Sequence, residues 1–425
     1  MKLGTLTLAT ALVFATAAMA QTAEAEGQAA APAETAPAYE PAPAAAAPAG
    51  EADFGSMRGR AYNIVGNQAG VPTVGNYLDK PHTLHGRKMV YVEPTNSFAA
   101  LSFGEGSTKF LAFDNSVGLG MMTLGLATKG FGASFDYAFG KRWRFDTDKQ
   151  TGGAKVERDI TNITAGDLLQ ARFSVPAGAY DLAARAFWLT YRNETETKTE
   201  SSNAGTTTTT ESDQDFWDYG AEVTVSNDPS AKDLFWSAGV LFVRHAADRM
   251  TKGGGTTRET NDPDATVTLQ PNVNVGLAVL KSDNARVLVG VNGSVPFSVY
   301  DGANNKNTNV KDSRFTLDFV ATPNILGELA LGESWLLFAG AAYFWEVLDV
   351  DHETYVTGNG TPAKETLNTT ILSMTTNTAF VNAGARFQRR NFAVEASVAN
   401  NFFNNPLEGF NGTNFIANLG GFIYF

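Results

Sequence analysis

The four histidines are the first residues to consider for metal or catalytic chemistry, because the chain has no cysteine. His82 and His85 lie close together, but a zinc site needs three or four well-placed ligands and no third histidine accompanies them. His245 lies between Arg244 and Asp248, yet no serine or threonine stands out as a nucleophile for it to activate. We therefore expect no catalytic residue, no metal, no cofactor and no enzymatic activity.

A second set of residues can act through charge rather than through bond making. Its members occupy the polar positions of stretches in which apolar and polar residues alternate, as Asp136 does between Phe135 and Tyr137. If these stretches are strands that close into a barrel, the polar positions line its interior. The lumen-lining candidates are then Asp136, Arg142, Arg144, Arg172, Asp181, Arg185, Asp218, Glu222, Arg314, Asp318, Glu346, Arg386 and Glu395. Two roles remain open, namely cross-strand pairs that stabilise a wet interior and a constriction that selects solutes.

The elements that position these residues repeat along most of the chain. From about residue 97 onward, stretches with the period of a β-strand follow one another without a helical interruption. Short turns, as at 176–178 and 332–334, alternate with long polar loops, as at 195–212 and 352–365. This plan predicts an all-β protein, a single antiparallel up-and-down transmembrane β-barrel with short periplasmic turns and long extracellular loops. Counting back from the carboxy-terminus to 108–113 gives about 14 strands, and 12 or 16 remain open.

The amino-terminal quarter has a different composition. Residues 1–20 have the features of a secretory signal peptide: Lys2, an apolar run, and small residues at Ala18 and Ala20. Residues 21–51 are rich in Ala, Pro and Glu and predict a disordered linker. Residues 52–96 lack alternation and form either a periplasmic lead-in segment or a plug of the lumen, followed by the barrel at 97–425. The formal net charge of -12 gives no indication of nucleic-acid binding.

The end of the chain carries a family resemblance. The stretch TNFIANLGGFIYF alternates and stops on Phe425. It resembles the terminal strand of Gram-negative outer-membrane β-barrels, which ends in Phe and is read by the assembly machinery. The resemblance implies location in the outer membrane, contact with the lipid bilayer and the barrel-assembly machinery, and an assembly signal at Phe425 and Ile423. It covers the signal peptide, the hairpin series and the terminal Phe, and it identifies no specific family.

Three functions follow from this class. The first is a porin-like channel for passive diffusion of small solutes, with the mixed-charge lumen as its filter. The second is a plugged channel for hydrophobic compounds, like the long-chain fatty-acid channels, with apolar pockets near Phe338, Phe344 and Phe380; the Asn-Pro-Ala motif of that family is absent. The third is a structural or adhesive barrel without transport. A row of small residues at 379–385 is compatible with a homo-oligomer contact.

Overall fold

The computed structural model of this chain describes residues 57–59, 71, 73–115, 120–152, 154–201, 206–227, 233–253, 256–301, 311–356, 362–371, 378–398 and 416–425. The signal peptide predicted over 1–20 and the linker predicted over 21–51 lie outside these residues. The described residues include three short helical segments: α2 (Val74–Asp79), η2 (Pro81–Leu84) and η3 (Pro94–Asn96). In the described part of the chain, no helix has the length and apolarity that a bilayer crossing requires.

Strands make up the rest of the described chain, and every pair of neighbouring strands is antiparallel. They are β1 (Met89–Glu93), β2 (Phe98–Phe103), β3 (Thr108–Asp114), β4 (Gly120–Ala127), β5 (Gly132–Gly152), β6 (Ala154–Ala177), β7 (Tyr180–Ser201), β8 (Thr206–Asn227), β9 (Leu234–Gly253), β10 (Thr256–Lys281), β11 (Ala285–Ser294), β12 (Phe297–Asp301), β13 (Lys311–Leu331), β14 (Trp335–Val356), β15 (Pro362–Ile371), β16 (Thr378–Arg389), β17 (Phe392–Val398) and β18 (Ile416–Tyr424).

The strands close into one barrel. Each strand pairs with the next along the chain except at β11–β12 and β15–β16, and the last strand, β18, pairs with β1 over Met89–Val92. Two positions in the wall are each built from two consecutive strands: β11 and β12 lie between β10 and β13, and β15 and β16 both pair with β14. The 18 strands therefore form a closed wall of 16 positions.

The predicted number of about fourteen strands is therefore too low, and sixteen, which the sequence left open, is observed. The positions from β3 onward agree with the count made back to residue 108. The two missing strands are β1 and β2, of only 5 and 6 residues, which are too short to produce a clear alternating pattern. β1 begins at Met89, inside the segment that was expected to precede the barrel.

The two faces of the wall differ in polarity, as the alternation predicts. In β5, Phe135 and Tyr137 are 49% and 40% exposed on the outside, whereas Asp136 between them is fully buried on the inside. The same contrast recurs around the ring, with outward Trp188, Tyr219 and Trp335. A closed wall satisfies every backbone hydrogen bond between neighbouring strands, so an apolar outer face can contact lipid. This is the architecture of an outer-membrane β-barrel.

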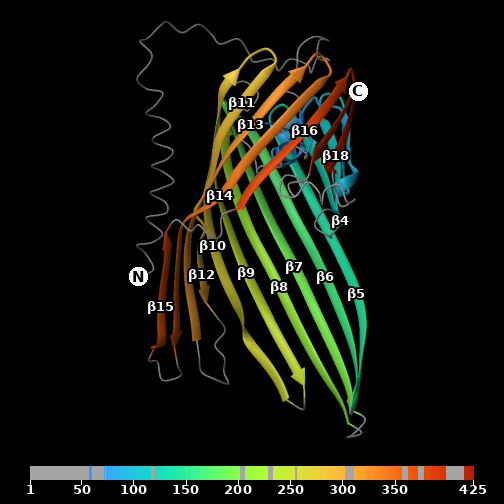
Figure 1. Ribbon diagram of the computed structural model, residues 1–425, viewed down its shortest axis with the longest axis vertical. Helices are drawn as coiled ribbons and strands as arrows, with labels where there is room; N and C mark the ends of the chain where they lie inside the picture. The colour runs from blue at the N-terminus through green and yellow to red at the C-terminus, as the bar shows by residue number, and fades with distance from the viewer. Residues whose placement is uncertain are drawn as a thin grey trace. The chain divides into compact units, whose positions relative to one another are not determined.

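The strands differ greatly in length, which distinguishes the two ends of the barrel. β1 to β4 have 5 to 8 residues, whereas β5 to β10 have 20 to 26. A bilayer needs only about 9–11 residues per strand, so the long strands continue well beyond it. Figure 1 shows β5 to β9 running away from the end at which the carboxy-terminus lies. The carboxy-terminus and the short turns therefore lie at one end of the barrel, and the long strands extend toward the other end. In barrels of this plan the end with the short turns is periplasmic.

Candidate functional site

A segment before β1 lies inside the wall at the short-turn end, and we call its described residues, 57–59, 71 and 73–88, the plug. Figure 1 shows it in blue, behind β16 and at the same end as the carboxy-terminus. Thr73 caps α2 through its hydroxyl, which accepts a hydrogen bond from the backbone N–H of Asn76 in a capping box. Pro81 then begins η2, as its fixed φ allows at a helix start.

The first anchor of the plug is Arg58, whose side chain is 1% exposed. Its Nε lies 3.6 Å from Oε1 of Glu328 on β13. Glu328 also accepts a 2.7 Å hydrogen bond from Nε of Arg286 on β11. One fully buried carboxylate thus lies between a guanidinium of the plug and a guanidinium of the wall. Such a buried arrangement is stable only while the opposite charges stay paired.

The second anchor holds the backbone on either side of Arg58. Arg386 on β16 donates from Nη1 to the carbonyl of Met57 at 3.0 Å and forms a buried ion pair with Glu395 on β17. Glu395 in turn accepts the backbone N–H of Gly59 at 2.6 Å. A Cβ on Gly59 would lie 2.4 Å from the Glu395 carboxylate and 2.6 Å from the hydroxyl of Tyr91. A side chain at position 59 would therefore have to displace Glu395 or Tyr91.

The third anchor lies on the opposite side of the ring. The imidazole of His82 contacts the hydroxyl of Ser174 at 2.7 Å and the carboxylate of Asp181 at 2.9 Å. Lys80 lies 3.8 Å from Asp181 and donates a hydrogen bond to Ser226 on β8. These contacts use both ring nitrogens of His82, the residue that the sequence offered as half of a superficial metal pair.

Apolar contacts fill the space around these anchors. Val74, Tyr77 and Leu84 of the plug are buried in one cluster with inward residues of β1 to β4, β17 and β18, among them Tyr91 and Phe422. Val71 belongs to a second cluster with Phe235, Leu288, Leu326, Ala330, Leu336 and Phe338. The inward apolar positions at this end are therefore covered by the plug.

The anchors lie on opposite sides of the barrel. Asp181 is on β7, the seventh position of the ring, and Glu395 is on β17, the fifteenth of sixteen positions. The plug therefore bridges the lumen from wall to wall at its periplasmic end. Which of the two roles weighed for residues 52–96 these contacts serve stays a prediction.

The inward side chains further along the strands remain accessible. Arg185 pairs with Glu222 at 2.7 Å, and His245 pairs with Asp218, with 43% of the His245 side chain exposed. Arg314 donates two hydrogen bonds, of 2.7 and 2.6 Å, to the carboxylate of Asp351, and 51% of the Arg314 side chain is exposed. Since these residues face the interior, their exposure indicates a vestibule on the extracellular side of the plug.

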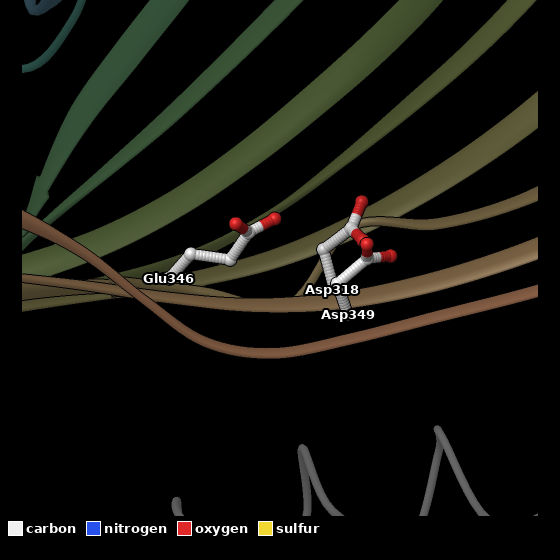
Figure 2. Close-up of side chains that lie close together, drawn as sticks. All are labelled: Asp318, Glu346 and Asp349. Atoms are coloured by element: carbon white, nitrogen blue, oxygen red, sulfur yellow. The ribbon is translucent and has the colours of Figure 1, made fainter. Parts of the chain in front are cut away.

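Three carboxylates converge in this vestibule. Asp318 on β13 and Glu346 and Asp349 on β14 have carboxylate oxygens within 4.8 Å of one another. Figure 2 shows the carboxylates of Asp318 and Asp349 adjacent, with Glu346 beside them. A β-bulge produces this arrangement: Phe319 pairs with Leu348, but Val320 pairs with Glu346, which leaves Val347 as an extra residue. Glu346 and Asp349 thus both lie on the inner face, although regular alternation would place residues three positions apart on opposite faces.

The predicted lumen residues with described side chains alternate along their strands with apolar residues, as Asp136 does with the exposed Phe135 and Tyr137, and that they line a solute path stays a prediction. Asp136 and Arg172 pair with each other, and so do Arg185 with Glu222 and Arg386 with Glu395. Asp181 contacts the plug, whereas Asp218, Arg314, Asp318 and Glu346 line the vestibule. Arg142 and Arg144 belong to β5, but their side chains lie outside the described part. Whether any of these residues selects solutes stays a prediction.

Sequence reasoning missed several residues of the site. Asp349 was not selected because regular alternation places it on the lipid face. Arg286 and Glu328 do occupy polar positions of alternating stretches, so the signal that identified the other candidates was present for them as well. Arg58 and His82 carried no signal, because a plug without periodicity does not indicate which of its residues meet the wall.

Comparison with known proteins adds little beyond the general fold. No protein-family model matches the chain, and no curated protein matches its sequence. Solved structures with similar strand arrangements include the transport unit of the autotransporter AIDA-I from Escherichia coli, at 9% identity and a TM-score of 0.31, covering 70% of this chain and 91% of that one. The ferric yersiniabactin uptake receptor FyuA from Yersinia pestis has 10% identity and a TM-score of 0.33, covering 80% and 68%. The outer membrane protein OmpT of Vibrio cholerae has 12% identity and a TM-score of 0.29, covering 80% and 95%.

Proposed function

We propose that this protein is an outer-membrane channel for small solutes, closed at its periplasmic end by the plug. The observation that carries the proposal is the bridging of the lumen by the described residues of the plug, with anchors on β13, β16 and β17 on one side and on β6, β7 and β8 on the other. A permanently open porin would not need this cover.

Diffusion is the mode of transport that the vestibule supports. Its inward charges occur as accessible pairs of both signs, such as Arg185 with Glu222 and Arg314 with Asp351. Accessible charged groups keep a lumen hydrated and act on passing solutes by electrostatic filtering. Solutes would therefore enter from outside, pass the charged section, and cross to the periplasm when the plug moves.

The test is single-channel conductance in planar bilayers with two forms of the protein. One is the mature chain, and the other lacks residues 21–87 behind the signal peptide and so retains β1 in full. We expect few or no openings from the mature chain and steady ohmic steps from the shortened one. Steady steps of equal size from both would show that the plug does not close the pore. Silence from both, with correctly folded barrels, would reject a channel and favour a structural or adhesive role.

A further inference from the structure

The vestibule contains an apolar surface that the wall itself does not require. On the inner face of β7 to β9, six side chains lie together: Phe187, Leu189, Tyr191, Phe216, Leu241 and Val243. Their inward direction follows from the alternate residues Trp188, Tyr219 and Phe242, which are 44%, 37% and 37% exposed on the lipid side. All six inward side chains are only partly buried, unlike the apolar residues under the plug.

Two aromatic members of this surface, Tyr191 and Phe216, form a continuous row with His245. The ring centroids of Tyr191 and Phe216 are 6.0 Å apart, and those of Phe216 and His245 are 5.7 Å apart. Asp218 binds Nδ1 of His245 and so places a carboxylate beside the row. Aromatic faces that remain accessible to water attract both flat apolar groups and cations.

Carboxylates occupy the same rows of the wall a few strands further round. One row crosses the wall through Glu222 on β8, Leu241 on β9 and Gln270 on β10, which are successive strand partners. It continues at Pro296, whose carbonyl accepts the backbone N–H of Asp318, and Asp318 pairs with Asp349 on β14. The next row runs from Val243 through Thr268, Ser298 and Thr316 to Asp351. The apolar surface and the carboxylates therefore face the same section of the lumen.

The charge of this section is unbalanced. Among the described inward side chains of β13 and β14 on the extracellular side of the plug, the carboxylates are Asp318, Glu346, Asp349, Asp351 and Glu353, and Arg314 is the cation. The accessible carboxylates lower the energy of a cation in the vestibule and raise that of an anion. A hydrocarbon chain with a carboxylate would fit the apolar surface but not the charge.

We infer that the vestibule binds small cationic solutes that carry an aromatic or alicyclic ring, with the ring against Phe216 and its neighbours and the charge toward the carboxylates of β13 and β14. This inference rests on the proposed function for its access route, since the solute must enter from the extracellular side. It names the class of solute that the channel would admit.

Binding can be tested without transport by isothermal titration calorimetry of the mature chain in detergent. The probes are benzyltrimethylammonium, which has both features, tetramethylammonium, which lacks the ring, and phenylacetate, which reverses the charge. We expect benzyltrimethylammonium to bind most tightly and Phe216→Ala to weaken it by about three- to tenfold, as for a desolvated cation–aromatic contact. Replacing Asp318 and Asp349 together by Asn should reduce the preference for benzyltrimethylammonium over phenylacetate.

The matched control is Trp188→Ala, which removes an aromatic residue from the lipid face of β7 and should leave binding unchanged. Equal losses in Phe216→Ala and Trp188→Ala, or phenylacetate binding as tightly as benzyltrimethylammonium, would overturn the inference. If the shortened chain conducts but the mature chain binds no probe, the inferred binding site is rejected and the proposed channel function is retained. If the probe binds but the shortened chain does not conduct, the channel function is rejected and the binding site is retained.

Discussion

At the scale of single residues, the plug and the wall meet most closely where glycine leaves room. Gly132 opens β5, and a Cβ built there would lie 2.0 Å from the backbone nitrogen of His82 and 2.4 Å from the carbonyl carbon of Pro81. Both are main-chain atoms, which cannot rotate away as the end of a side chain does. The fit of η2 against β5 therefore depends on this glycine.

Replacing Gly132 by Ala should consequently displace the plug while leaving the wall closed. We expect the variant to open far more often than the unaltered chain in planar bilayers, because η2 must move away from β5, toward the barrel axis, by more than an ångström. Gly130→Ala is the matched control, since a Cβ there meets nothing within 4 Å. A Gly132→Ala channel as silent as the control would mean that the plug tolerates the shift without opening.

Glu328 is the residue on which the first anchor depends. Its replacement by Gln leaves two guanidiniums, Arg58 and Arg286, buried without their shared carboxylate. Removing one partner of a buried pair costs about 3–5 kcal/mol, so we expect a large drop in the urea concentration at which the barrel unfolds. The unfolding is followed by the heat-dependent migration of the barrel on gels.

The control for this variant is Asp233→Asn. Asp233 pairs with Lys281 at the surface, where both side chains are about two-thirds exposed, at 66% and 65%. A solvated pair of this kind is worth about 0–1 kcal/mol. If Glu328→Gln unfolds at the same urea concentration as Asp233→Asn, the buried carboxylate does not secure the plug.

Where the strands are regular, the burial of charged residues follows the alternation in the sequence. Asp136, Arg386 and Glu395 are buried between more exposed neighbours, and their role in a lumen stays a prediction. Asp349 does not follow the alternation, because the extra residue Val347 shifts it within β14. A bulge leaves the composition of the stretch unchanged, so the sequence alone gives no sign of where the inner and outer faces exchange.

At the scale of elements, β1 links the plug to the wall. It pairs with β2 on one side and with β18 on the other, and it starts one residue after the plug ends. Removal of residues 21–87 therefore leaves the ring complete, whereas removal of residues 21–96 deletes β1 and unpairs two strands. We expect the first variant to give a folded, heat-modifiable barrel and the second to stay unfolded or to aggregate.

Gel migration with and without heating distinguishes these outcomes. A folded barrel from the second variant would show that β2 can pair with β18 directly and that β1 is dispensable for closure. Aggregation of both variants would instead show that the wall cannot form without the plug. The sequence before residue 97 lacks sustained alternation because β1 has only five residues and is followed at once by Pro94 and η3.

At the scale of the whole molecule, the charge of the vestibule should set the selectivity of the open pore. In a gradient of potassium chloride, the shortened chain is expected to prefer cations, because Asp318, Glu346 and Asp349 present three carboxylates to the lumen. Replacing them by Asn, Gln and Asn should shift the reversal potential toward that of a non-selective pore. A preference unchanged by the triple replacement, or a preference for anions in the shortened chain, would contradict this.

The closed, all-antiparallel architecture and the direction of most charged residues could be predicted from the sequence, because period-two alternation is a property of each strand by itself. The plug contacts could not. They join residues such as Gly59 and Glu395, 336 positions apart, whose meeting depends on the completed ring.

The same separation has a consequence for the order of assembly. Contacts between the two ends of a chain have the highest cost in loop-closure entropy and form late. Glu395, whose carboxylate accepts the hydrogen bond from the backbone N–H of Gly59, is on β17, next to the seam at which β18 pairs with β1. The plug cannot be fully seated until that seam is joined. Under the proposed function, the pore would therefore be closed only in the last step of folding.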